Sequence, residues 1–155
     1  MKKRVIVTES SYGAKGKPAR TDSRGARPLV GAKFEGAAAA IAQLPPAGPG
    51  ELAFAGRSNS GKSSAINALA RETQLARASR TPGRTRQINF FRLRNGARVA
   101  DLPGYGYAAV PRSLKQEWRD LLWHYVTNRT TLIALVVVVD VRHGMTDLDY
   151  ALLDG

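Results

Sequence analysis

The chain has 155 residues, 43% of them hydrophobic, and a formal net charge of +12 at pH 7, which suits one modest globular domain. It contains no cysteine, which excludes disulfides and thiolate metal sites and is compatible with a reducing compartment. The longest apolar run, residues 132–139, is too short to span a bilayer, and the apolar residues near the N-terminus are too few for a signal peptide. We therefore expect a cytoplasmic protein without a membrane span.

Basic residues are concentrated at the start of the chain. Residues 1–33 hold nine Lys or Arg against two acidic residues, are rich in Gly, Pro, Ser and Thr, and lack apolar periodicity. This predicts a basic, largely disordered tail over 1–33 and a folded domain over 34–155. Such a tail would add salt-dependent affinity for RNA phosphates, or it would be a solvated extension, and the sequence leaves both readings open.

The first expected elements surround a glycine-rich segment. Residues 34–43 fit a short helix, and a Pro- and Gly-rich breaker follows over 45–50. Residues 51–56 then read as an apolar strand, and residues 64–71 have apolar side chains at helical spacing. Residues 72–86 are polar and contain a Thr-Pro-Gly loop signature.

The second half predicts two strands in a hairpin, a helix, a strand and a further helix. Residues 87–94 and 97–101 read as strands joined by a two-residue turn at Asn95-Gly96. Ser113 and Gln116 match a capping box at the start of an amphipathic helix that continues to residue 126. The Val-rich segment 131–140 suits a strand buried on both faces of a parallel sheet, and residues 145–153 begin another helix.

The glycine-rich segment over residues 56–63 is a full match to the phosphate-binding pattern G-x-x-x-x-G-K-[ST]. Its glycines allow several backbone N–H groups to point at phosphate oxygens, and the following helix contributes its positive N-terminal end. The lysine adds a point charge, and the last serine offers a hydroxyl to Mg²⁺. The residues predicted to hold phosphate are Gly56, Arg57, Ser58, Asn59, Ser60, Gly61, Lys62 and Ser63.

A second motif, Asp101-Leu102-Pro103-Gly104, ends the hairpin's second strand. P-loop NTPases place an acidic residue at such a strand end to hold Mg²⁺, so Asp101 is the candidate ligand. The Gly104 N–H could bond a γ-phosphate oxygen, because no side chain blocks the approach. The loop that follows would then respond to hydrolysis.

These elements together predict an α/β fold of the P-loop NTPase class. We expect a Ras-like three-layer domain with a mostly parallel sheet and one antiparallel hairpin strand. The phosphate chemistry should lie at the carboxyl ends of the strands.

Further motifs accompany the phosphate loop. Residues 54–64, 81–85 with 88–91, 101–108 and 140–144 read FAGRSNSGKSS, TPGRT, INFF, DLPGYGYA and DVRHG. On these motifs the chain resembles the EngB (YihA/YsxC) family of bacterial GTP-binding proteins. The motifs cover the chain from about residue 52 to its end, so the basic tail is not included.

The resemblance implies a GTPase that requires Mg²⁺, acts in assembly of the large ribosomal subunit, and is needed for normal septation in cell division. The implied partners are GTP, GDP and the large ribosomal subunit or its rRNA, with no DNA expected. By motif matching, Ser63, Thr85 and Asp101 would ligate Mg²⁺. The first switch would contain Gly83, Arg84, Thr85, Arg86 and Gln87, where Arg86 replaces the family's usual Gln.

Catalysis is assigned by the resemblance to Lys62, Thr85 and Asn59. Tyr105 follows the D-x-x-G motif where Ras-type enzymes have a water-orienting Gln, so intrinsic turnover should be slow. Asn59 fits two roles: it accompanies K⁺ binding beside the phosphates, or it braces its own loop by hydrogen bonds.

The T/N-K-x-D motif that reads guanine in this superfamily is absent from the chain. We therefore expect a truncated domain, in which the strand at 132–139 would form an exposed apolar sheet edge. Two alternatives to a GTPase stay open: a non-catalytic fragment that binds phosphate and RNA, and a P-loop ATPase.

Overall fold

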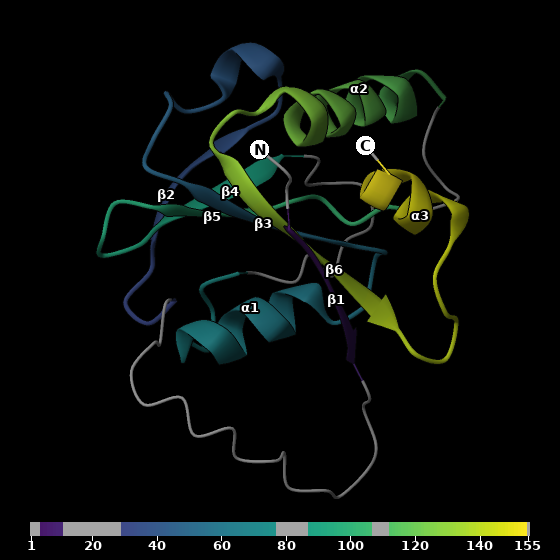
Figure 1. Ribbon diagram of the computed structural model, residues 1–155, viewed down its shortest axis with the longest axis horizontal. Coiled ribbons are helices and arrows are strands. Elements are labelled where there is room, and N and C mark those ends of the chain that lie inside the picture. The colour runs from purple at the N-terminus through teal and green to yellow at the C-terminus, as the bar shows by residue number, and fades with distance from the viewer. Residues whose placement is uncertain (1–3, 11–28, 77–86, 107–111, 155) are drawn as a thin grey trace, which may run out of the picture.

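The computed structural model describes residues 4–10, 29–76, 87–106 and 112–154, and within them six strands form one sheet (Figure 1). The strand order is β1-β6-β3-β5-β4-β2. The strands are β1 (Arg4–Ser10), β2 (Lys33–Ala38), β3 (Glu51–Gly56), β4 (Ile88–Arg92), β5 (Arg98–Asp101) and β6 (Leu132–Asp140). β4 is antiparallel to both of its neighbours, and the other pairs are parallel. The predicted fold class, a mostly parallel sheet with one antiparallel hairpin strand, is confirmed.

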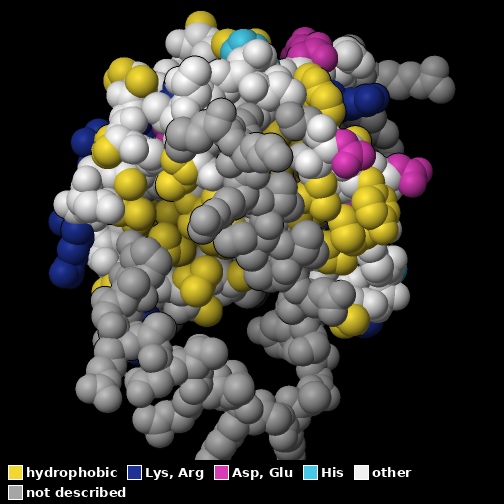
Figure 2. Space-filling view, in the orientation of Figure 1, with side chains coloured by type: hydrophobic (Ala, Val, Ile, Leu, Met, Phe, Trp, Pro, Cys, Tyr) yellow, Lys and Arg dark blue, Asp and Glu magenta, His cyan; other side chains and the backbone are white. Residues whose placement is uncertain are grey.

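Helices cover both faces of the sheet, as Figure 1 shows. They are α1 (Lys62–Ala70) on one face, and α2 (Arg112–Asn128) and α3 (Asp147–Asp154) on the other, with a 3₁₀ turn at Ile41–Gln43. In the space-filling view, hydrophobic side chains lie across the middle of the visible face, and Lys and Arg lie toward its rim (Figure 2). The result is a three-layer α/β domain.

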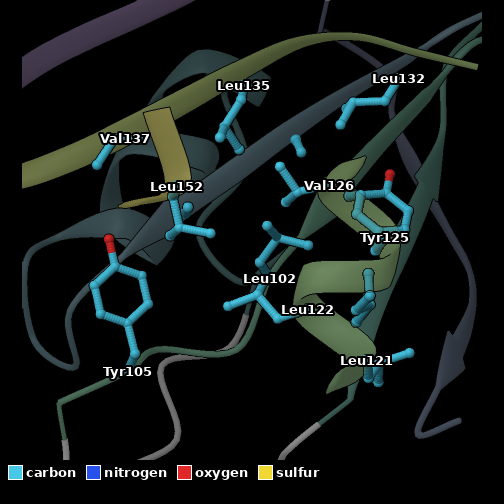
Figure 3. Packing of buried hydrophobic residues seen from close by; sticks show 14 of the residues in the cluster. Leu102, Tyr105, Leu121, Leu122, Tyr125, Val126, Leu132, Leu135, Val137 and Leu152 are labelled. Carbon is cyan, nitrogen blue, oxygen red and sulfur yellow. The ribbon is translucent and has the colours of Figure 1, made fainter. Parts of the chain in front are cut away.

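Each sheet face has its own core cluster. The cluster facing α2 and α3 includes Tyr125 and Leu152, and its packing is shown in Figure 3. The cluster facing α1 includes Ile66. β6 contributes Val137 to the first cluster and Val138 to the second, because successive side chains of a strand point to opposite faces. The expectation that this strand is buried on both faces is confirmed.

The predicted helix over 34–43 is wrong. Residues 33–38 form β2, which pairs antiparallel with β4, and only the 3₁₀ turn follows. Ala38 is fully buried in the sheet, while Phe34 is 61% exposed and stacks edge-on against Phe91 of β4. Pairing with an available strand overrides the helical preference of an alanine-rich segment, whose Gly36 also weakens a helix.

The N-terminal segment is not wholly a tail. Residues 4–10 form β1, which pairs in parallel with β6 in a register from Arg4 opposite Ala134 to Ser10 opposite Asp140. The expectation that β6 forms an exposed edge is therefore wrong. Leu29 is also buried, with 2% exposure. The Val-Ile-Val run has the β-branched side chains that favour a strand, and residues 11–28 lie outside the described residues.

The hairpin between β4 and β5 is present, but its turn differs from the two-residue prediction. The Leu93 N–H donates to the Ala97 carbonyl at 2.8 Å, and the Gly96 N–H donates to the Leu93 carbonyl at 3.0 Å. Three residues therefore form the loop. Gly96 has φ +82°, the left-handed conformation that a three-residue hairpin requires at this position.

Candidate phosphate-binding site

The segment 56–63 connects the carboxyl end of β3 to the first turn of α1. Asn59 and Gly61 both adopt left-handed conformations, with φ +65° and +92°, and the Ser60 N–H donates to the Arg57 carbonyl at 3.1 Å. These turns bring the chain directly into α1, whose first turn contains no acidic residue. A helix N-terminus whose own first turn carries no carboxylate suits an anion.

Gly56 begins the loop at a crowded point of the sheet. A Cβ there would lie 2.6 Å from the Ser60 hydroxyl oxygen and 2.6 Å from the Val138 carbonyl oxygen. Ser60 is 5% exposed, and its hydroxyl has no hydrogen-bond partner among the described residues. Ser58 and Asn59, in contrast, are exposed. Within the described part of the chain, the Asn59 side chain makes no hydrogen bond that would brace the loop.

A buried ion pair joins the phosphate loop to the second motif. Lys62 Nζ donates to Asp101 Oδ1, and the two residues are 9% and 4% exposed. Asp101 reaches this position because β5 pairs with β3, where Asp101 is opposite Phe54. The two motifs, 39 positions apart in sequence, therefore meet at one edge of the sheet.

The Asp101-to-Gly104 segment then folds back onto the loop. Leu102 is fully buried in the core, whereas Gly104 is exposed and lies against Ser58. A Cβ on Gly104 would lie 3.1 Å from Ser58 Cα and 3.2 Å from its nitrogen. The close contact therefore favours glycine at this position.

Tyr105 makes main-chain hydrogen bonds with the phosphate loop on both of its sides. Its carbonyl accepts from the Ser58 N–H at 2.9 Å, and its own N–H donates to the Gly56 carbonyl at 3.4 Å. Its side chain is 2% exposed and packs in the core cluster that faces α2 and α3, so it does not occupy the position of a water-orienting group. Its hydroxyl donates to Asp149 of α3. Burial, together with the neighbouring Asp149 carboxylate, raises the pKa of this phenol.

Of the residues predicted for the first switch, only Gln87 lies within the described part of the chain. Gly83, Arg84, Thr85 and Arg86 lie outside the described residues, and Gln87 is exposed just before β4. The role of Thr85 as an Mg²⁺ ligand therefore stays a prediction.

Two supporting residues were missed by the sequence analysis. Asn67 of α1 holds the segment after the helix: its side chain donates to the Ala76 carbonyl at 2.9 Å and accepts from the Ala76 N–H at 2.7 Å. Asp149 holds the side chain of Tyr105. Only the polar nature of Asn67 in the middle of an amphipathic helix gave a signal in the sequence. Asp149 gave none, because acidic residues are common in the first turn of a helix.

The donor set fits Mg²⁺ better than a softer metal. Asp101 supplies a carboxylate, and the half-buried Ser63, next to Lys62, supplies a hydroxyl. Oxygen ligands in small number, completed by water and phosphate, are what Mg²⁺ binds in nucleotide sites.

Among the residues that the structure describes, none of the helices has the length and hydropathy that crossing a bilayer would take.

Comparison with known proteins agrees with this geometry. The family model described as "50S ribosome-binding GTPase" matches residues 51–155. A protein named "Probable GTP-binding protein EngB" from Aromatoleum aromaticum is 55% identical over 123 residues, which are 79% of this chain and 57% of that protein. The protein of the same name from Azoarcus sp. is also 55% identical over 123 residues, 59% of its length.

A solved structure shows the same fold. The structure titled "Crystal structure of a probable GTP-binding protein engB" is 28% identical, with a TM-score of 0.51 over 67% of this chain and 64% of that one. The chain thus spans somewhat more than half the length of the curated relatives described above. The resemblance to EngB proteins is confirmed, and the chain belongs to the 50S ribosome-binding GTPase family.

Proposed function

We propose that this chain binds GTP with Mg²⁺ and hydrolyses it to GDP and phosphate, in the service of large ribosomal subunit assembly and normal septation. Family membership supports the nucleotide and the ribosomal partner. Action on the ribosomal subunit would take place in the cytoplasm. The observation that carries the proposal is the buried contact between Lys62 and Asp101, because it unites the phosphate loop with the predicted metal ligand.

The N–H groups of Ser58 and Ser60 already donate to backbone carbonyls, so in this proposal the N–H groups of Asn59 and of residues 61–63 bind the phosphates, and the Lys62 ammonium neutralises their negative charge. Ser63, Thr85 and Asp101 would hold Mg²⁺, which offsets the charge that develops on the phosphate oxygens. The Gly104 N–H would bond the γ-phosphate. The Lys62 ammonium has three N–H donors and uses one on Asp101, so it can donate to phosphate with the others.

Catalytic power in this site should be modest. The side chain that follows the D-x-x-G motif is Tyr105, and its hydroxyl donates to Asp149 in the core. It therefore orients no water, which supports a slow intrinsic rate. Asn59 is exposed on the loop with its side chain unengaged among the described residues, and we propose that it holds K⁺ beside the phosphates. Equal hydrolysis rates in K⁺ and Na⁺, with and without ribosomal particles, would remove it from that role.

The direct test replaces Lys62 by Ala and measures affinity for a non-hydrolysable GTP analogue by titration calorimetry with Mg²⁺. Losing a buried charge partner of the phosphates should cost about 2 to 5 kcal/mol, an affinity loss of about 30-fold or more. Lys33→Ala is the matched control, because it removes an exposed lysine at the start of β2. Unchanged affinity in folded Lys62→Ala protein would contradict the proposal.

Guanine preference needs its own measurement, because base-reading residues are absent from this chain. Parallel titrations with GTP, GDP and ATP, each with and without Mg²⁺, separate a GTPase from an ATPase. Because the guanine-reading motif is absent, the proposal expects GTP and ATP to bind this chain with similar affinity, and a GTP preference to appear only in a longer protein that carries the T/N-K-x-D motif. A preference for ATP in both proteins would instead support the ATPase reading.

A further inference from the structure

Tyr105 links the phosphate loop to helix α3 through one residue. Its backbone is bonded to Gly56 and Ser58 in the loop, as described above, and its ring crosses the core beneath them. Figure 3 shows the ring directed toward the part of the core formed by Leu152 of α3 and Val137 of β6. The two ends of the residue therefore report on different parts of the molecule.

The far end of this link is firmly held. Asp149 is 2% exposed and accepts the Tyr105 hydroxyl through Oδ1. Its other oxygen, Oδ2, accepts from both the backbone N–H and the hydroxyl of Thr146, each at 2.7 Å. The ring of Tyr105 also packs against Trp118 of α2, with centroids 6.4 Å apart. Two helices thus fix the orientation of one side chain.

The backbone end of Tyr105 restrains the neighbouring Gly104. Gly104 is the residue whose N–H is proposed to bond the γ-phosphate, and it has no Cβ with which the core could hold it. The hydrogen bonds of its neighbour Tyr105 supply that restraint instead. A donor that is already in place costs less ordering entropy when a ligand arrives.

We infer that Tyr105 is a positioning residue, whose bond to Asp149 sets the Gly104 N–H for the γ-phosphate. The inference rests on the proposed function, since it concerns the same site. It makes a selective claim: the bond favours triphosphate over diphosphate, because only the triphosphate has the group that Gly104 contacts. A residue that merely supported the fold would affect both ligands alike.

The test is Tyr105→Phe, which keeps the ring and removes the hydroxyl. Affinity for a non-hydrolysable GTP analogue and for GDP is measured by calorimetry with Mg²⁺. We expect affinity for the analogue to fall about two- to tenfold, the range that one hydrogen bond commands, with GDP affinity unchanged. Asp149→Ala should also lower the ratio of the affinity for the analogue to the affinity for GDP. Adding Tyr105→Phe to the Asp149→Ala protein should produce no further fall in this ratio.

Tyr150→Phe is the matched control. It removes the hydroxyl of an exposed tyrosine in the same helix, α3, so both thermal stability and the triphosphate-to-diphosphate ratio should stay constant. An unchanged ratio in Tyr105→Phe, or an equal loss for both ligands, would overturn the inference. If the unaltered protein binds neither nucleotide, the proposed function itself fails, which is a different and recognisable outcome.

Discussion

Buried charges lie at both ends of β3, and the two groups differ in how completely they are satisfied. At the carboxyl end Lys62 meets Asp101. At the amino end Glu51 meets Arg98 and Arg129, and Glu51 is fully buried. Both groups take charge out of water, which is costly without partners. The number of internal partners decides which group is structural and which is available to a ligand.

The amino-end group is closed. Glu51 accepts from the Tyr125 hydroxyl at 2.8 Å and from Arg129 at 2.9 and 2.6 Å, and Arg98 lies 3.5 Å away. Arg129 in turn donates to the Pro45 carbonyl at 2.7 Å. The cluster thereby joins the start of β3 to the start of β5 and to the chain just after α2. A carboxylate with this many donors has no remaining capacity for a ligand.

The ion pair at the carboxyl end still has hydrogen-bond donors available for a ligand. Within the described residues, the three N–H donors of Lys62 have Asp101 as their single hydrogen-bond acceptor. An anion with several oxygens would satisfy them better. Two substitutions and one change of pH test this difference between the two groups, and they follow in decreasing order of expected effect.

Replacing Glu51 by Ala should have the largest effect on folding. It leaves Arg129 without its carboxylate partner, whereas Arg98 keeps its ion pair with Glu35, and we expect the free energy of unfolding to fall by about 3 to 5 kcal/mol, measured by urea denaturation. Glu72→Ala, which removes an exposed carboxylate after α1, should change little. If the folded Glu51→Ala protein also lost nucleotide affinity, the two ends would not be independent.

Replacing Asp101 by Asn should affect the ligand more than the fold. The amide oxygen can still accept from Lys62, so stability should fall less than in Glu51→Ala. The gain in GTP-analogue affinity on adding Mg²⁺ should shrink by about tenfold or more, because a carboxylate ligand is lost. Asp154→Asn, at the exposed end of α3, is the control. An intact Mg²⁺ dependence would exclude Asp101 as a metal ligand.

Acid should weaken the amino-end cluster. Burial acts to raise the pKa of Glu51, but hydrogen bonds from Arg129 and Tyr125 outweigh it and hold the pKa below its ordinary value of 4.5. A lowered pKa in the folded state means that the stabilisation is present above the unfolded pKa and is lost as pH falls through the folded one. The free energy of unfolding, measured by urea denaturation, should therefore fall as the pH is lowered below about 4.5. This group should contribute a slope of at most about 1.4 kcal/mol per pH unit.

Glu51→Gln separates this group from the other carboxylates. The slope below about pH 4.5 should become shallower in that variant, because its side chain does not titrate. An identical acid slope in both proteins would mean that other carboxylates dominate.

The sequence predicted those parts of the molecule that local patterns encode. The phosphate motif, the hairpin and the β-branched run of β6 each have a short-range signal, so their elements and the α/β class could be recognised. β2 could not, because its strand state depends on pairing with β4, which is distant in sequence. The 34–43 prediction failed for this reason. β1 has a β-branched run of only three residues, inside a segment whose overall composition indicates disorder.

The site shows the same division. That Lys62 and Asp101 would be near each other follows from motif spacing, since parallel strands end at one edge. That Tyr105 would turn into the core and bond Asp149 does not, because it requires knowing how α3 packs on the sheet. Likewise, the Glu51 cluster gathers residues from three distant segments and has no motif.

The contact at Gly104 has a consequence for sequence variation. Even a methyl group there would lie within 3.2 Å of two Ser58 backbone atoms, so the phosphate loop itself would have to give way. Gly104→Ala would therefore push the Asp101-to-Gly104 segment and the phosphate loop apart. The added methyl group would do so by shape alone, because the substitution changes no charge and removes no hydrogen-bonding group.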